Sequence, residues 1–235
     1  MGRNYAQARR SSPVLEFRLR SRALLAAEVY CGRRGRPQDA RVLDLGAAEG
    51  ATLLQLRELL GPAGQFDGVE LSAELLGEAG RLPDNVRLIA GDVTRLPREL
   101  EDQSYDLVTA LAVLEHLEDP LRCLREAYRV LVPGGVVVAT SPSPIWDELA
   151  GRLGLVEAEH HAQKLGAEQL LSWARRAGFE RVGFEPFMWA PIGALPYLRL
   201  PIPPGRARRL DRSLARWRLL RSTFVNQCIV GSRPE

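Results

Sequence analysis

Carboxylates and small residues accompany two successive apolar runs of the chain. The first run contains Asp44 and is followed by three small residues, Gly46, Ala48 and Gly50. Small residues at such a point let a ligand approach the backbone closely. Glu70 ends the next run, twenty residues past Gly50, where a carboxylate can accept hydrogen bonds from both hydroxyls of a ribose. This spacing predicts a nucleoside-binding site.

A third carboxylate, Asp92, follows the next apolar run and lies between Gly91 and Val93. Its oxygens can accept a hydrogen bond from the amino group of an adenine. Three such positions at three successive strand ends predict one adenosine-containing ligand. Each position also has a structural explanation. Asp44 and Glu70 can be solvated strand ends, and Asp92 can cap the turn that follows it.

The segments that carry these residues belong to a regular alternation of apolar runs and helical stretches. The apolar runs predict strands at residues 41–45, 66–70, 86–90, 105–111, 136–140, 181–185 and 224–230. The helical stretches predict helices at residues 14–31, 51–60, 73–80, 120–131 and 168–177. Alternation at this spacing is typical of a parallel sheet with helices on both faces. We therefore expect one compact α/β unit with seven strands.

The order and spacing of these motifs resemble the class I S-adenosylmethionine-dependent methyltransferases, in the branch of quinone-biosynthesis-type and other small-molecule enzymes. The resemblance covers roughly residues 41–141, with matching pieces at residues 42–50, 70–72, 91–93, 105–108, 114–117 and 131–135. A weaker likeness continues through residues 160–161 and 170–179. The resemblance implies a Rossmann-like, doubly wound, seven-stranded mixed sheet whose last strand is inserted antiparallel. It also implies S-adenosyl-L-methionine as the cofactor.

The resemblance further implies which residues hold the cofactor. The implied contacts are Asp44 and Gly46 with its amino acid end, Glu70 with its ribose, Asp92 with its adenine, and Leu71 and Val93 with the faces of the ring. The remaining expected cofactor-binding residues are Ala48, Gly50, Gly91 and Leu111. Ala48 departs from the family, which usually has glycine there, and its methyl group narrows the space beside the methionine part of the cofactor. We expect binding to survive in weakened form.

A nicotinamide dinucleotide site is the alternative for the first motif, because Gly46, Ala48 and Ala51 form a degenerate GxGxxG pattern. The position of Asp44 two residues before the glycine argues against it. So do the segment 114–117 and the lack of an obvious second catalytic domain. The methyltransferase interpretation is therefore the one that we carry forward.

His116 is the candidate catalytic residue, because an imidazole with an unperturbed pKa of about 6.5 suits a general base near neutrality. A structural or cofactor-side role for His116 is the alternative. His160 and His161 either contact the acceptor or lie in an exposed loop. No metal ligand is expected, since the three histidines lack an accompanying carboxylate pattern. The three cysteines are far apart in the sequence and are expected to be free thiols.

Arginine is concentrated in two flanks of the chain. Residues 1–41 hold ten Arg and three acidic residues, and residues 206–222 hold seven Arg and one Asp. Residues 206–221 predict a basic helix whose one face carries Leu210, Leu214, Trp217 and Leu220. Such a helix more commonly packs on its own domain, but it can also lie on an anionic membrane. The apolar residues 187–198 before it add support for a membrane or a lipid-like acceptor. Nucleic acid is not expected as a partner.

The sequence thus predicts four parts. These are an N-terminal helical lid, residues 1–40; a Rossmann-like core, residues 41–186; an insertion with the basic helix, residues 187–222; and the last strand with the tail, residues 223–235. We expect a cytoplasmic methyltransferase, with peripheral membrane contact through residues 206–221, that acts on a small-molecule or lipid-like acceptor. Tyr5 belongs to the segment expected to close over the cofactor. The alternative is a non-catalytic or weakly active membrane-associated module that retains the fold.

Overall fold

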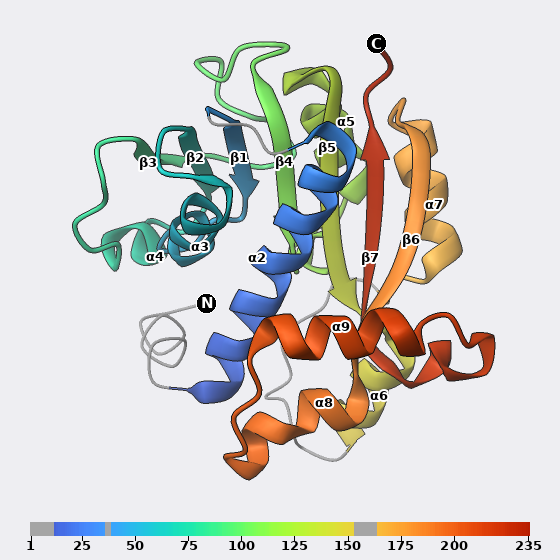
Figure 1. Ribbon diagram of the computed structural model, residues 1–235. Helices are drawn as coiled ribbons and strands as arrows, with labels where there is room; N and C mark the ends of the chain where they lie inside the picture. Colours follow the sequence, from blue (N-terminus) through green and yellow to red (C-terminus); the bar gives the residue numbers. More distant parts are fainter. Residues whose placement is uncertain (1–11, 36–38, 153–163) are drawn as a thin grey trace.

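The protein folds around one seven-stranded mixed sheet with helices on both faces, as the computed structural model shows for residues 12–35, 39–152 and 164–235 (Figure 1). The strands lie in the order β3-β2-β1-β4-β5-β7-β6. Their bounds are β1 Arg41–Leu45, β2 Gln65–Glu70, β3 Val86–Ala90, β4 Tyr105–Leu111, β5 Leu131–Pro142, β6 Glu180–Trp189 and β7 Phe224–Ser232. Six neighbouring pairs make up the sheet, and only the two that involve β7 are antiparallel. The expected fold class and the inserted antiparallel strand are confirmed.

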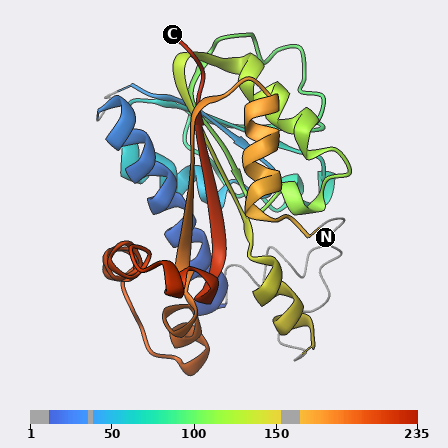
Figure 2. The same ribbon diagram turned by 90° about the vertical axis from the view of Figure 1, so that its right-hand side faces the viewer.

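Helices cover the two faces of this sheet and bury its apolar side chains in two large clusters (Figure 2). On one face lie α2 Pro13–Arg34 and α3 Ala51–Leu60, and on the other lie α5 Pro120–Val130 and α7 Ala167–Arg176. The remaining elements are α4 Ala73–Gly77, α6 Pro144–Arg152, α8 Ala190–Ala194, α9 Pro204–Leu214 and the short 3-10 helices η1 Leu114–His116, η2 Leu195–Leu198 and η3 Arg218–Thr223.

Local sequence explains where the long helices begin. Ser12 precedes α2, and its hydroxyl accepts from the backbone N–H of Leu15 at 3.4 Å. Asp119 caps α5 in the same way, accepting from the N–H of Arg122 at 3.0 Å. A proline at the first helical position follows each cap, where its missing N–H costs nothing.

Several elements differ in length from the sequence-based expectation, and pairing between strands accounts for the longest differences. β5 begins at Leu131 rather than at residue 136, because Leu131 pairs with Tyr105 before a shift in register. β6 continues to Trp189, which pairs with Phe224, so the buried Phe187 lies within a strand and not in a loop. In contrast, α4 ends at Gly77, three residues earlier than expected.

The expected continuous helix over residues 206–221 is wrong. α9 ends at Leu214 and is followed by η3, so Leu210, Leu214, Trp217 and Leu220 do not form one helical face. Leu210 is 50% exposed and Trp217 is 68% exposed. Leu210 and Trp217 therefore do not anchor this segment to the protein, whereas Leu214 and Leu220 are half-buried.

The cysteines are free thiols, as expected, with Cys123 and Cys228 buried and Cys31 half-buried. Burial raises the pKa of the Cys123 and Cys228 thiols well above the usual range. Within the ranges that the structure describes, no helix has both the length and the apolar character needed to cross a bilayer. Among the same residues, no group of His, Cys, Asp and Glu side chains gathers closely enough to hold a metal ion.

Candidate functional site

The turn between β1 and α3 adopts an unusual backbone conformation. Gly46, Ala48 and Gly50 all have positive φ angles, of 75°, 49° and 85°. A Cβ atom on Gly46 would approach Cγ2 of Val113 to 2.5 Å, so this position requires glycine. The N–H groups of Gly46 and Ala47 both donate to the carbonyl of Val69, at 2.8 and 3.0 Å, which fixes the turn against β2.

Glu70 ties this turn to the one that follows β2. Its Oε2 accepts from the backbone N–H of Ala48 at 3.0 Å, and its Oε1 accepts from the N–H of Ser72 at 2.8 Å. The left-handed conformation of Ala48 is uncommon for a residue with a Cβ atom, and the bond to Glu70 helps to hold it. Because each carboxylate oxygen can accept a second hydrogen bond, Glu70 can hold both turns and still bind two hydroxyls.

Asp44 lies one strand over from Glu70 and is buried, with 2% of its surface exposed. The hydroxyl of Thr109, on β4, donates to Oδ1 of Asp44 at 2.6 Å. This bond orients the carboxylate, since β1 and β4 are parallel neighbours with Asp44 directly opposite Thr109. Thr109 was not among the site residues predicted from the sequence, because its position within β4 gives no local signal of this contact.

Asp92 caps the turn that follows β3, which is the structural role considered for it above. Its Oδ1 accepts from the N–H of Thr94 at 2.7 Å and from the Thr94 hydroxyl at 2.8 Å, so Asp92 does cap this turn. Oδ2 makes no hydrogen bond within the described part of the chain, which leaves it open to a ligand. Val93 is buried in the hydrophobic core, whereas Leu71 is 73% exposed. Leu71 thus presents the larger apolar surface at this edge of the sheet.

The segment after β4 completes the same edge. Leu111 is half-buried, and the N–H of Ala112 donates to the carbonyl and the hydroxyl of Thr140 at 2.9 and 3.1 Å. These bonds hold the turn between β4 and η1 against β5. His116, at the end of η1, is half-buried, and the adjacent Glu115 is buried.

The parallel sheet is what brings these residues together. The carboxyl ends of β1, β2, β3 and β4 lie at one edge, because these strands are adjacent and parallel. The segments after all four strands therefore meet at the site. His160, His161 and Tyr5 lie outside the residues that the structure describes.

A family model described as a methyltransferase domain matches residues 37–182 of the chain. Among curated proteins, an uncharacterized 37.1 kDa protein in transposon TN4556 of Streptomyces fradiae is 40% identical over 110 residues, which are 46% of this chain and 31% of that protein. The demethylmenaquinone methyltransferase of Staphylococcus aureus is 36% identical over 107 residues, which are 44% of this chain and 43% of that enzyme. The chain thus matches less than half the length of these curated relatives.

Solved structures resemble nearly the whole chain. The phosphoethanolamine N-methyltransferase 2 of Haemonchus contortus, solved in complex with S-adenosyl-L-methionine, has a TM-score of 0.64 at 19% identity. The match covers 90% of this chain and 53% of that one. At this level of identity the likeness concerns the fold.

Proposed function

The chain belongs to the methyltransferase domain family, and from this premise we propose that it transfers a methyl group from S-adenosyl-L-methionine to a small-molecule or lipid-like acceptor. The observation that carries the proposal is the arrangement of Asp44, Glu70 and Asp92 at the ends of three adjacent parallel strands. Glu70 is fixed there by the turns on both sides of it. The family match does not favour the alternative of a non-catalytic module.

The hydrogen-bond acceptors at this edge of the sheet fit the hydroxyl and amino groups of the proposed cofactor. The cofactor, when bound, supplies an electrophilic methyl group on a sulfonium centre. We propose that Asp44 and Gly46 hold its amino acid end, with Ala48 and Gly50 shaping the turn beside it. Glu70 accepts from the ribose hydroxyls. The remaining proposed contacts are Asp92 through Oδ2 with the adenine amino group, and Leu71, Gly91, Val93 and Leu111 with the ring and its surroundings.

The chain's own contribution to methyl transfer is chiefly the alignment of the two reactants. An acceptor that carries a proton at the attacking atom also needs a base. We propose His116 for this role, since it follows β4 at the same edge as the cofactor residues. A role in cofactor binding is the alternative for this residue.

His116→Asn separates these two roles, because asparagine retains polarity but does not titrate. If His116 is the base, kcat should fall by about 100-fold. The affinity for S-adenosylhomocysteine should stay the same, and the rise of activity with pH around neutrality should disappear. A variant with weakened cofactor affinity and an unchanged pH profile would assign His116 to the cofactor instead.

We propose that residues 41–186 and 223–235 form the catalytic core, and that the N-terminal segment and residues 187–222 enclose the acceptor. We also propose that the protein is cytoplasmic and contacts a membrane peripherally through residues 206–221. The likeness to an enzyme whose name includes demethylmenaquinone supports screening quinones and phenols first.

A thermal-shift titration with S-adenosylmethionine, S-adenosylhomocysteine and NAD tests the proposed cofactor. A ligand at 100 times its dissociation constant stabilises the folded state by about 2.7 kcal/mol. For a chain of this length, that is a rise in melting temperature of roughly 5–10 °C. We expect this rise with the two adenosyl ligands and none with NAD. The absence of a shift with the adenosyl ligands would contradict the proposal.

A further inference from the structure

The helix α9 packs on the protein largely through charged side chains. Its buried residues are Ala207, Arg208 and Asp211, which lie on one face of the helix. Leu210, between them in sequence, is 50% exposed. This orientation is the reverse of the usual one, in which apolar residues face the core.

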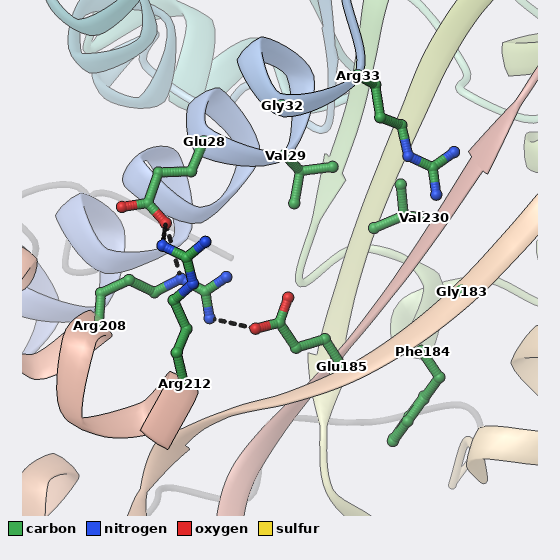
Figure 3. Close-up of a pocket in the computed structure, with 10 residues that line it drawn as sticks. All are labelled: Glu28, Val29, Gly32, Arg33, Gly183, Phe184, Glu185, Arg208, Arg212 and Val230. Atoms are coloured by element: carbon green, nitrogen blue, oxygen red, sulfur yellow. Dashed lines mark hydrogen bonds and ion pairs between the residues drawn. The ribbon is translucent and has the colours of Figure 1, made fainter. Parts of the chain in front are cut away.

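Arg208 is the first of two anchors that fix this orientation (Figure 3). Its Nη1 donates to Glu185 on β6 at 2.7 Å, and its Nε donates to Glu28 on α2 at 3.2 Å. Burial lowers the pKa of Arg208, but hydrogen bonds and charge from the two carboxylates outweigh it, so the pKa stays above its ordinary value. The charge of Arg208 is thus balanced within the protein. We call Arg208, Glu28 and Glu185 together the joint, because their contacts hold α9 against α2 and β6.

Asp211 is the second anchor. Its carboxylate accepts from the backbone N–H of Met188 at 2.7 Å and of Trp189 at 2.9 Å. Met188 has a φ angle of 62°, an uncommon conformation for a residue with a long side chain. Asp211 therefore binds α9 to the point where β6 turns into α8, and rotation of α9 would break both of its bonds.

With α9 held in this way, apolar side chains of the segment face outward. The structure describes ten exposed large hydrophobic residues, and six of them lie between residues 195 and 221. We call these six, together with the exposed arginines of the same segment, the insertion surface. Its apolar members are Tyr197, Leu198, Leu200, Leu210, Trp217 and Leu219, the last of which is 91% exposed. Such a concentration marks an interaction site.

Exposed arginines accompany these apolar side chains in the same segment. There are seven of them, and all except Arg212 form no ion pair within the part of the chain that the structure describes. The six without an ion pair there are Arg199, Arg206, Arg209, Arg216, Arg218 and Arg221. The only acidic residue of the segment, Asp211, is buried on the inner face of α9. The insertion surface is therefore both apolar and strongly positive.

We propose that the insertion surface docks on an anionic lipid bilayer, an inference that rests on the proposed function and names the partner of its acceptor side. A bilayer interface takes up leucine and tryptophan side chains and also attracts arginine through its lipid phosphates. A nucleic acid would pair with the arginines but would leave the leucines in water. A protein partner would have to combine an apolar face with a dense set of acidic residues.

The position of this surface relates it to the site. In both views, α8 and α9 lie beyond the edge of the sheet where β5 ends, the edge at which the carboxyl ends of the parallel strands meet (Figures 1 and 2). Docking through α9, η2 and η3 would therefore bring the carboxyl edge of the sheet close to the bilayer. An amphiphilic acceptor could then reach the site from the lipid phase.

Co-sedimentation with vesicles tests the docking directly and without cofactor. We expect the full chain to bind vesicles of phosphatidylcholine with phosphatidylglycerol, and to bind phosphatidylcholine alone at least about tenfold more weakly. Added salt should weaken the binding. Arg209→Glu with Arg216→Glu should reduce partition by roughly tenfold or more. Trp217→Ser with Leu219→Ser should cause a loss of similar size, because it removes apolar side chains from the bilayer interface.

Matched variants on other surfaces control for charge and for hydrophobicity. Arg122→Glu with Arg125→Glu makes the same charge change on α5, which covers the opposite face of the sheet. Leu54→Ser removes an exposed leucine from α3. Both should leave vesicle binding unchanged.

Three results would overturn the docking proposal. They are no binding by the parent chain, equal losses in the control variants, and binding to duplex DNA that is as tight as to vesicles and indifferent to Trp217→Ser with Leu219→Ser. Because S-adenosylhomocysteine binding is measured separately, vesicle binding without a thermal shift would contradict the proposed function and leave the docking surface intact. A thermal shift without vesicle binding would do the reverse.

Discussion

Glu70→Ala is expected to weaken the binding of S-adenosylhomocysteine by at least about 100-fold, since each hydrogen bond to a charged group contributes about 1.5–3 kcal/mol. The variant loses the carboxylate proposed to accept from two ribose hydroxyls. It also releases the N–H groups of Ala48 and Ser72, which Glu70 now holds in place. Both effects act on the same ligand, so this substitution should be the most damaging one at the site. Isothermal titration calorimetry measures the change.

Two further variants test whether the loss of affinity comes from the carboxylate of Glu70 itself. Glu70→Gln keeps one acceptor oxygen and should lose roughly tenfold in affinity, because its amide group cannot accept at both positions. Glu58→Ala removes an exposed carboxylate from α3 and should bind like the parent chain. An unchanged affinity in Glu70→Ala, with the fold intact by circular dichroism, would remove Glu70 from the proposed site.

Arg208→Ala is expected to lower the free energy of unfolding by about 2–3 kcal/mol. Breaking a buried ion pair from one side costs about 3–5 kcal/mol. The expected value here is smaller, because the side chains of Glu28 and Glu185 are 33% and 30% exposed and water can partly solvate them. The corresponding fall in melting temperature is roughly 5–10 °C for a chain of this length.

Arg212 provides a matched control in the same helix. Its guanidinium lies 3.7 Å from the same oxygen of Glu28, but its side chain is 61% exposed, so Arg212→Ala should cost less than about 0.5 kcal/mol. Arg208→Met combined with Glu185→Gln and Glu28→Gln should recover part of the loss, because no unpaired carboxylate stays in the joint. Equal effects of Arg208→Ala and Arg212→Ala would show that the joint does not anchor α9.

The alternation of strands and helices and the order of the site residues could be read from the sequence, because both depend on neighbours in the chain. An apolar run such as residues 105–111 predicts its own strand, and Glu70 or Asp92 at the end of a parallel strand must come to the carboxyl edge. Strand lengths were less predictable. Leu131 and Trp189 extend their strands only because Tyr105 and Phe224 lie beside them.

The fold class follows from the local pattern of the sequence, as does the edge of the sheet at which Asp44, Glu70 and Asp92 lie. The buried face of α9, in contrast, depends on contacts that form only in the folded chain. Hydrophobic periodicity placed Leu210 on the apolar face of a predicted helix and Arg208 outside that face, whereas in the structure Leu210 is exposed and Arg208 is buried. The reason is distance along the chain: Arg208 pairs with Glu28, 180 residues away, and with Glu185, 23 residues away. Local periodicity records the polarity of a helix but not the partners that its charges will meet.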